Sequence, residues 1–195
     1  MCGRYQFSCG NSRALRRIVR GLAALPGNEP WEGGEVFPGQ KAPVLLEKQG
    51  RLAATLFVWG FPGREKQGLV INARAESAPE RPMFRSCVER RRCVVPCSGF
   101  YEWDATRHKY LFRRKGENEV YLAALYDRHE QQGRFCILTT APNESVRGVH
   151  DRMPLVLAPG EVRPWLTDLG AALSLLKQQP APLEKQSADG QLALW

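Results

Sequence analysis

"CVVPCSGFYEW", at residues 93–103, is the stretch from which the fold of this chain is predicted. Its β-branched and aromatic residues favour extended structure. Similar runs follow at residues 109–115, 119–127 and 134–142, with short polar links between them. Consecutive strands with short links tend to pair antiparallel. The stretch therefore predicts a β-rich α+β fold built mainly from antiparallel sheets.

Helical patterns flank these strands. Residues 11–25 predict an amphipathic helix that Asn11 or Ser12 caps, with its arginines on a solvated face. The other predicted elements are a hairpin over residues 44–60, a strand over 69–76, a short helix over 81–92, a helical turn within 143–154 and a helix over 161–177. Because no internal repeat divides the chain, we expect one domain over residues 1–180. A linker-like tail follows over residues 181–195.

The charge of the chain limits the classes of partner. The 195 residues carry a formal net charge of +8, and 43% of them are hydrophobic. A basic surface favours a polyanion, and nucleic acid is preferred over a membrane because no apolar stretch could span a bilayer. No apolar leader segment follows Arg4. We therefore expect a cytoplasmic, nucleoid-associated monomer that does not bind membranes.

Six cysteines raise the question of disulfides and metals. Disulfides are rare in a reducing cytosol. Cys93 and Cys97 are close in sequence, but no second cysteine or histidine pair completes a zinc set. We therefore expect no metal, and we expect four cysteines to behave as small buried hydrophobes: Cys87, Cys93, Cys97 and Cys136.

Cys2 directly follows Met1, which is an unusual place for a thiol. Removal of Met1 would leave a free α-amine and a thiol on one residue. An α-amine has a reference pKa of about 7.7–8.0, so part of it is unprotonated at neutral pH. The amine can form a Schiff base with an aldehyde, and the thiol can then close a thiazolidine ring. Taken alone, however, Cys2 is better explained as an incidental residue.

Glu102 belongs to an apolar strand. In one continuous strand, Val94, Pro96, Ser98, Phe100 and Glu102 would share a face. A carboxylate among apolar side chains is either paired or has a raised pKa, and a pKa near 7 suits a general acid. A salt bridge to an arginine is the alternative interpretation.

His150 and Asn72 are two further candidates. His150 lies in a loop pattern, where a histidine can titrate near neutral pH or can simply be exposed. Asn72 lies on the polar side of its strand, where it could orient a substrate hydroxyl or cap a turn. An arginine follows two positions after Cys2, Asn72 and His150, at Arg4, Arg74 and Arg152. Residues two apart in extended chain point the same way, so this arrangement suits a substrate flanked by phosphates.

Four segments in this order resemble the SRAP family, the SOS-response-associated peptidase-like proteins that shield abasic sites in DNA. The segments are Cys2-Gly3-Arg4, Asn72-Ala73-Arg74, the "GFYEW" of residues 99–103 and the "HDRMP" of residues 150–154. The stretches "VFPGQKAPV", "WGFPG", "RPMF" and "PLVL" extend the resemblance over nearly the whole chain. A barrel-like arrangement of the sheets is expected on this basis.

The resemblance implies a mechanism. Family members crosslink their N-terminal cysteine to the aldehyde of an abasic site in single-stranded DNA. Cys2 would be the nucleophile, Glu102 the proton donor and acceptor, His150 an aid to proton transfer and Asn72 a holder of the reacting group. The resemblance also implies autocatalytic release of Met1, with neither metal nor organic cofactor. The implied DNA-contacting residues are Arg4, Arg74, Arg152 and Thr139.

The chain departs from the family in one respect. Some members carry a tryptophan pair just after the "WG" segment, whereas here Trp59-Gly60 is followed by "FPGREKQG". Stacking against DNA bases would then have to come from Phe61 or from the region of Pro38, Met83 and Phe84.

The tail ends in "QLALW" at residues 191–195. This resembles the glutamine–leucine–x–leucine–aromatic peptide with which bacterial repair proteins bind the replication sliding clamp. Packing of these residues onto the domain itself is the favoured interpretation, and the two need not exclude each other.

Two other functions remain open from the residues alone. One is an N-terminal cysteine-nucleophile peptidase or amidohydrolase, which would need an oxyanion hole. The other is a non-catalytic single-stranded DNA binder that uses basic and aromatic side chains.

Overall fold

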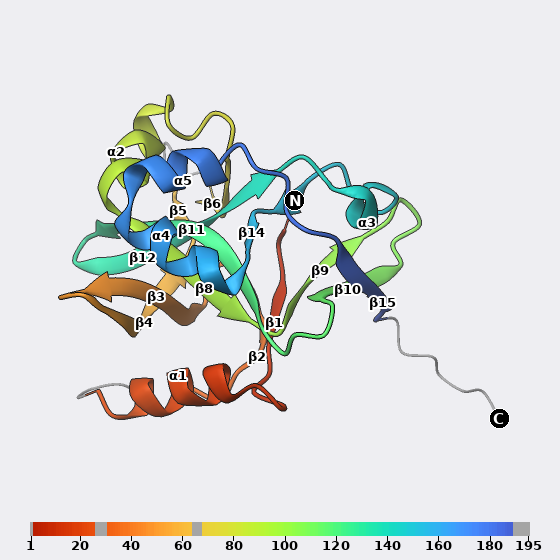
Figure 1. Ribbon diagram of the computed structural model, residues 1–195, viewed down its shortest axis with the longest axis horizontal. Coiled ribbons are helices and arrows are strands. Elements are labelled where there is room, and N and C mark those ends of the chain that lie inside the picture. The colour runs from red at the N-terminus through yellow and green to blue at the C-terminus, as the bar shows by residue number, and fades with distance from the viewer. Residues whose placement is uncertain (1, 26–30, 64–67, 189–195) are drawn as a thin grey trace.

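The computed structural model describes residues 2–25, 31–63 and 68–188. Its strands form two sheets and a small two-stranded ribbon, with helices packed around them (Figure 1). Among the described residues, no helix is long and apolar enough to cross a membrane. The helices are α1 (Arg13–Ala23), α2 (Pro82–Arg90), α3 (Glu144–Arg147), α4 (Val162–Thr167) and α5 (Leu169–Leu175), with a 3₁₀ turn at Pro159–Glu161.

The larger sheet closes on itself. Within the described chain, consecutive pairings run β12–β4–β3–β8–β11 and return from β11 to β12. This ring confirms the barrel-like α+β expectation, and all its pairings are antiparallel except β12–β4. The ring strands are β3 (Lys41–Lys48), β4 (Arg51–Trp59), β8 (Arg92–Cys97), β11 (Val120–His129) and β12 (Gln132–Thr140). Three short strands extend its edges: β7 (Asn72–Arg74), β13 (Met153–Pro154) and β14 (Val156–Leu157).

The second sheet has the order β15–β10–β9–β1–β2 in the described residues. Its strands are β1 (Tyr5–Phe7), β2 (Gly34–Val36), β9 (Gly99–Trp103), β10 (Lys109–Arg114) and β15 (Leu183–Ser187). The ribbon consists of β5 (Phe61–Pro62) and β6 (Leu69–Val70). Because β1 lies next to β9, the sheet holds the N-terminal segment beside the strand that carries Glu102.

Residues 93–103 form parts of two strands, whereas one continuous strand was expected from the sequence. They belong to β8 in the barrel as far as Cys97 and to β9 in the second sheet from Gly99 onward. The hydroxyl of Ser98 donates to the carbonyl of Gln6 at 3.0 Å and fixes the corner between them. Gly99 is required there, because a Cβ would lie 2.7 Å from the Phe112 carbonyl oxygen. The expectation that Val94 shares a face with Phe100 is therefore wrong.

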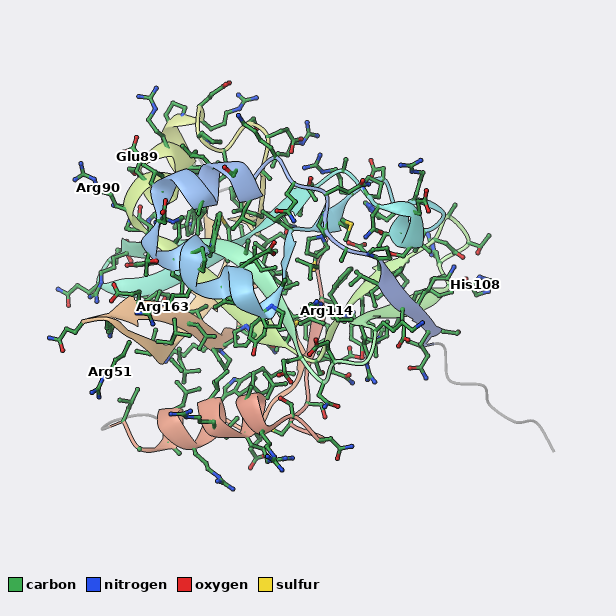
Figure 2. The ribbon with its side chains drawn as sticks, in the orientation of Figure 1. Arg51, Glu89, Arg90, His108, Arg114 and Arg163 are labelled. Carbon is green, nitrogen blue, oxygen red and sulfur yellow. The ribbon has the colours of Figure 1, made fainter. Side chains whose placement is uncertain are left out.

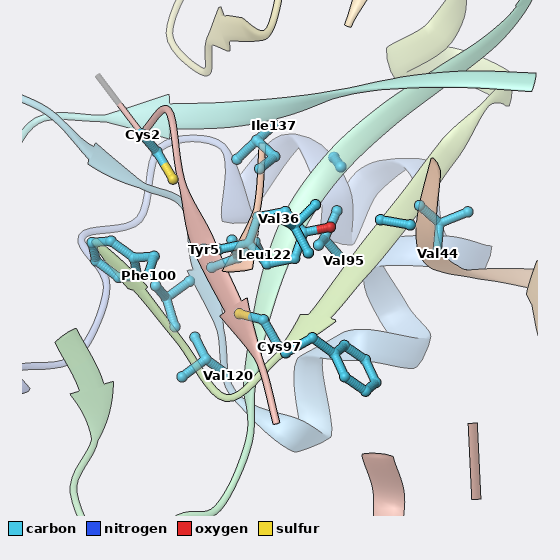
Figure 3. Close-up of a cluster of buried hydrophobic side chains, with 14 of the residues drawn as sticks. Cys2, Tyr5, Val36, Val44, Val95, Cys97, Phe100, Val120, Leu122 and Ile137 are labelled. Carbon is cyan, nitrogen blue, oxygen red and sulfur yellow. The ribbon is translucent and has the colours of Figure 1, made fainter. Parts of the chain in front are cut away.

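Alternation along the barrel strands divides the core into two clusters. The first contains Cys2, Tyr5 and Phe100 together with inward residues of the barrel, as the close-up in Figure 3 shows. The second, which includes Val94 and Trp165, lies beneath α2, α4 and α5. Cys2 is thus a core residue, although it is the second residue of the chain.

Arg92 is a buried cation at the boundary between α2 and α4. Its guanidinium donates to the carbonyls of Val88 and Glu89 at the end of α2, and to those of Trp165 and Leu166 in α4. Backbone carbonyls at helix ends lack partners within their own helix and carry partial negative charge. Arg92 therefore satisfies these carbonyls and joins two helices that pack on the second cluster.

Three predicted elements differ from the structure. The predicted helix over residues 161–177 breaks at Asp168, whose extended backbone and side chain cap α5 through the Ala171 N–H. The predicted strand over residues 69–76 is interrupted at Ile71. Part of the expected linker is β15, which pairs with β10 through five residue pairs, so ladder hydrogen bonds order this segment. The hairpin, the helix over residues 81–92 and the Ser12 cap of α1 agree with the predictions.

Candidate functional site

Cys2 lies just before β1 and packs against inward residues of the barrel. Its side chain is fully buried, and its thiol lies 3.9 Å from the carbonyl oxygen of Arg4, which it can approach as a weak donor. The side-chain amide of Asn72 donates to the backbone carbonyl of Cys2 at 2.9 Å. Burial, and then the charge of Glu102, raise the pKa of the Cys2 thiol well above its usual value. The thiol is therefore neutral at physiological pH.

Asn72 has a second polar atom at this site. Its side-chain carbonyl oxygen is buried and accepts no hydrogen bond from any described residue. Asn72 lies on β7, which pairs with Ile137 of β12, so the barrel fixes its position. A buried acceptor without a donor is costly unless a ligand satisfies it. Asn72 can therefore hold the backbone of Cys2 and accept a hydrogen bond from a substrate at once.

Glu102 lies on β9, two residues beyond Phe100, which pairs with Tyr5 of β1. At Glu102 itself, β9 pairs with Tyr110 of β10. Its side chain is 3% exposed. Burial raises the pKa of Glu102 from 4.5 to about 7, and the charge of Asp151 acts in the same direction. A carboxyl group with such a pKa is present in both protonation states at neutral pH, so it can donate and accept protons.

His150 lies beside Glu102. Its Nε2 atom is 3.9 Å from Oε2 of Glu102, and its Nδ1 accepts from the backbone N–H of Arg152 at 3.0 Å. Burial lowers the pKa of His150, against the opposing charge of the exposed Asp151. The imidazole is therefore mainly neutral at pH 7 and can take up a proton. The structure brings together the four reactive candidates of the sequence analysis: Cys2, Asn72, Glu102 and His150.

Arg4 extends from this site toward an aromatic surface. Its guanidinium lies 4.4 Å from the Phe37 ring centroid and 5.0 Å from that of Trp103. Nη1 of Arg4 contacts Oε2 of Glu35 at 3.2 Å, and Nζ of Lys109 contacts the other oxygen at 2.6 Å. Glu35 therefore binds both cations.

Arg152 is held in a similar way. Its guanidinium makes two bonds to the carboxylate of Glu76, at 2.7 and 2.9 Å, and a third to the backbone carbonyl of Thr139 at 2.6 Å. Thr139 itself is buried and lies against Arg152. Arg74 is exposed, and its side chain makes no ion pair or hydrogen bond within the described residues. Arg74 is thus a cation available to an incoming phosphate.

Comparison with known proteins identifies the family to which this chain belongs. The family model "SOS response associated peptidase (SRAP)" matches residues 1–189. The chain belongs to the SRAP family.

The relatives of this SRAP protein carry a common name. The chain is 29% identical over 177 residues to the Escherichia coli "Abasic site processing protein YedK", covering 85% of this chain and 79% of that protein. It is 31% identical over 175 residues to the Bacillus subtilis "Abasic site processing protein YoqW", covering 80% of this chain and 78% of that protein. A Bordetella bronchiseptica crystal structure has a TM-score of 0.76 at 22% identity, covering 95% of this chain and 99% of that one, which supports the fold alone.

Of the residues that were expected to stack on DNA bases, one is fully buried in the structure of this SRAP chain and three are half-buried. Phe61 is 1% exposed and packs beside Phe84, so the interpretation of Phe61 as a base-stacking residue is wrong. Met83 and Phe84 lie in the first turn of α2, half-buried against the second core cluster. Pro38 lies half-buried in the turn after β2.

Several residues beside the candidate site were missed by sequence reasoning. Phe37 is 36% exposed and stacks on Arg4, and the alternation that buries Val36 could have revealed it. The acidic partners Glu35 and Glu76 are distant in sequence from the arginines that they bind. No local pattern could have paired them. Within the described residues, no cluster of three or more His, Cys, Asp or Glu side chains could hold a metal.

Proposed function

We propose that this chain binds single-stranded DNA at abasic sites and joins Cys2 to the sugar aldehyde as a thiazolidine, which shields the lesion. One observation carries the proposal: Cys2 is fixed by Asn72 in a site where a carboxyl group, Glu102, has a pKa of about 7. Amine condensation with an aldehyde needs proton donation and removal at the same pH. The names of the relatives support the choice of abasic DNA as the substrate.

The first step requires a free α-amine on Cys2, so Met1 must be removed. The site itself would release Met1, as the family name suggests. The amine nitrogen then attacks the aldehyde carbon of the ring-opened sugar. Glu102 protonates the resulting hydroxyl group, which leaves as water, and a Schiff base forms. His150, mainly neutral beside Glu102, takes up the proton released by the nitrogen.

The second step closes the ring. The thiol sulfur adds to the imine carbon, a carbon–sulfur bond forms, and the thiol proton passes to the nitrogen. The product differs from the reactants only by the loss of one water. A neutral thiol is suited to this step because it brings the proton that the nitrogen needs. In this proposal the buried acceptor of Asn72 receives a hydrogen bond from the sugar or the new nitrogen, which its lack of a donor among the described residues supports.

The arginines bind the strand on both sides of the lesion. Phosphates replace Glu35 at Arg4 and Glu76 at Arg152, while Arg74 receives a phosphate directly. These contacts position the strand without reading its sequence. Phe37, stacked on Arg4 and exposed, offers an aromatic face to an adjacent base. Pro38, Met83 and Phe84 remain proposed contacts beyond it.

A neutral, buried thiol argues against the peptidase alternative as the main activity. In ring closure the imine nitrogen takes the thiol proton as the sulfur adds, whereas attack on a peptide carbonyl uses a thiolate formed beforehand, which burial disfavours at Cys2. The third function, non-covalent binding of single strands, uses the same arginines but gives no role to the raised pKa of Glu102.

A denaturing gel separates the three functions. The protein is incubated with a single strand containing one abasic site and with the same strand intact. We expect a slower band with the abasic strand alone, and Cys2→Ala should abolish it. A hydroxylamine-sensitive thioester with a peptide substrate would favour the peptidase. Equal retention of both strands in a native gel, without any covalent band, would favour the simple binder.

A second proposed partner is the replication sliding clamp, through residues 191–195. These residues lie outside the described part of the chain, and support comes from the sequence alone. A short anchor beyond the core would raise the local concentration of the protein near replicating DNA. Deletion of residues 191–195 should abolish binding to the purified clamp and leave the melting temperature unchanged. A large fall in melting temperature, with no clamp binding by the intact protein, would instead show packing onto the domain.

A further inference from the structure

A groove lies between α1 and the β3–β4 hairpin, and the chemistry proposed above does not use it. It has a volume of about 1030 Å³. Its aliphatic lining includes Ile18 of α1 and Leu45, Ala53 and Ala54 of the hairpin. In Figure 1, α1 runs along one side of the molecule with the hairpin next to it, and the N-terminus lies elsewhere. The groove is therefore separate from the Cys2 site.

Two large apolar side chains are exposed at this groove. Leu25, just beyond the end of α1, is 43% exposed, and Leu52 of β4 is 47% exposed. They are more exposed than the other large hydrophobic residues of the described chain. Exposed apolar groups that line one concave surface are typical of a binding site rather than of solvated surface. The groove thus offers an apolar floor and apolar side chains at its opening.

The charge of the groove is of one sign. Among the described residues, four arginines line it and no acidic residue does: Arg17, Arg20, Arg51 and Arg163. In Figure 2, Arg51 lies between the hairpin and α1, and Arg163 projects from α4. Arg163 also donates to the carbonyl of Gly50, which ties α4 to the tip of the hairpin. An acidic ligand would therefore meet cations from three separate elements.

We propose that this groove binds an acidic peptide segment of a partner protein, with aliphatic side chains on the floor and carboxylates at the arginines. A peptide fits better than nucleic acid because the floor is mainly aliphatic. Single-stranded nucleic acid is bound by stacking on aromatic rings, and Tyr121 is the one aromatic residue in the described lining. Arginine–carboxylate pairing supplies specificity, and burial of leucine-type side chains supplies affinity.

The edge of β4 supports a peptide occupant. β4 pairs with β3 from Arg51 to Val58, but with β12 only at Val58 and Trp59. Over residues 51–57, no described strand pairs with its other edge. Unpaired backbone groups at a sheet edge can accept an added strand. The peptide can therefore combine backbone pairing to β4 with the side-chain contacts of the groove.

The test uses the full chain and a fluorescein-labelled synthetic peptide, Asp-Leu-Glu-Asp-Leu-Leu-Glu, in fluorescence anisotropy. We expect a Kd below about 100 µM at low salt. The double variant Arg17→Glu/Arg51→Glu should weaken binding at least tenfold, and Leu52→Ser should weaken it several-fold. Arg90→Glu reverses an exposed arginine at the end of α2, away from the groove, and serves as the matched control. Melting temperatures verify that each variant is folded.

The outcomes are distinct. A peptide with Asn and Gln in place of its acids, or with Ser in place of Leu, should bind much more weakly. The double variant should crosslink abasic DNA at the wild-type rate, which separates this proposal from the function of Cys2. Equal peptide binding by wild type and double variant would overturn the proposal. A loss of single-stranded DNA affinity in the double variant would assign the groove to nucleic acid and overturn it as well. Stronger binding of a peptide of residues 181–195 would assign it to a second copy of the chain.

Discussion

Replacement of Glu102 by glutamine tests the raised pKa through both activity and stability. Burial raises the pKa of Glu102 from 4.5 to about 7, and one pKa unit corresponds to about 1.4 kcal/mol. Ionisation of the folded-state carboxyl therefore costs about 3 kcal/mol. Because the folded pKa lies above the unfolded one, the stability given by the neutral carboxyl is complete below pH 4.5. It is lost as the pH rises to about 7.

Glu102→Gln keeps the shape and removes this ionisation. The wild type should lose stability between pH 4.5 and about pH 8, whereas the variant should lose about 3 kcal/mol less over the same range. For a domain of this size that difference corresponds to roughly 6–12 °C in melting temperature. Any constant cost of burying the amide cancels in the comparison. The measurement is differential scanning fluorimetry of both proteins across this pH range.

The same variant should crosslink slowly. General acid–base catalysis contributes typically 10²–10⁴-fold, so the single-turnover rate with an abasic oligonucleotide should fall by about a hundredfold or more. Affinity for the intact strand should not change, because the Glu102 side chain is buried and not exposed to a phosphate. A variant with the wild-type crosslinking rate would remove Glu102 from the mechanism. Parallel melting curves for the two proteins across the pH range would refute the raised pKa.

The remaining predictions concern binding and stability. Arg74→Ala should weaken binding to intact single strands and reduce the salt dependence by about one ion, measured by anisotropy titration; a change in crosslinking alone would contradict this. Glu76→Gln frees Arg152 and should tighten that binding up to about fivefold at low salt, whereas weaker binding would mean that Glu76 positions Arg152 for DNA. Tyr5→Phe removes a buried hydroxyl without a partner among the described residues, so urea unfolding should show about 1 kcal/mol more stability, and a loss would reveal a hidden partner. Arg92→Met leaves buried helix-end carbonyls without donors and should cost about 3 kcal/mol in the same assay; an unchanged midpoint would contradict its bridging role.

Local pattern predicted the elements better than their connections. The strands of β10, β11 and β12 and the cap of α1 follow from β-branched runs, polar links and a serine at the right position. The corner at Ser98 did not follow, because the run on either side of it is equally apolar. Its cause is a contact with Gln6 of a strand far away in sequence, and the close approach of Gly99 to β10.

The reactive residues of the candidate site could be proposed from the sequence, but the acidic partners of its arginines could not. Cys2 and Glu102 are unusual for their positions, and the motifs around them are specific, so both could be identified from the sequence. Their environment depends on burial by strands that are remote in sequence. Glu35 and Glu76 look like ordinary exposed acids until the fold brings them to Arg4 and Arg152. The strand β15 was missed because its polar residues resemble a linker, although they pair with β10.

Intact-protein mass spectrometry of the crosslink tests the central claim most directly. The protein is incubated with an oligonucleotide that contains one abasic site, without any reducing agent, and the adduct is then digested and sequenced. The account predicts the mass of the chain without Met1, plus the oligonucleotide, less one water, with the modification on Cys2. It also predicts that Cys2→Ser gives an adduct only after borohydride reduction. An unreduced adduct of equal yield in Cys2→Ser, or a wild-type adduct that retains Met1, would contradict thiazolidine formation at Cys2.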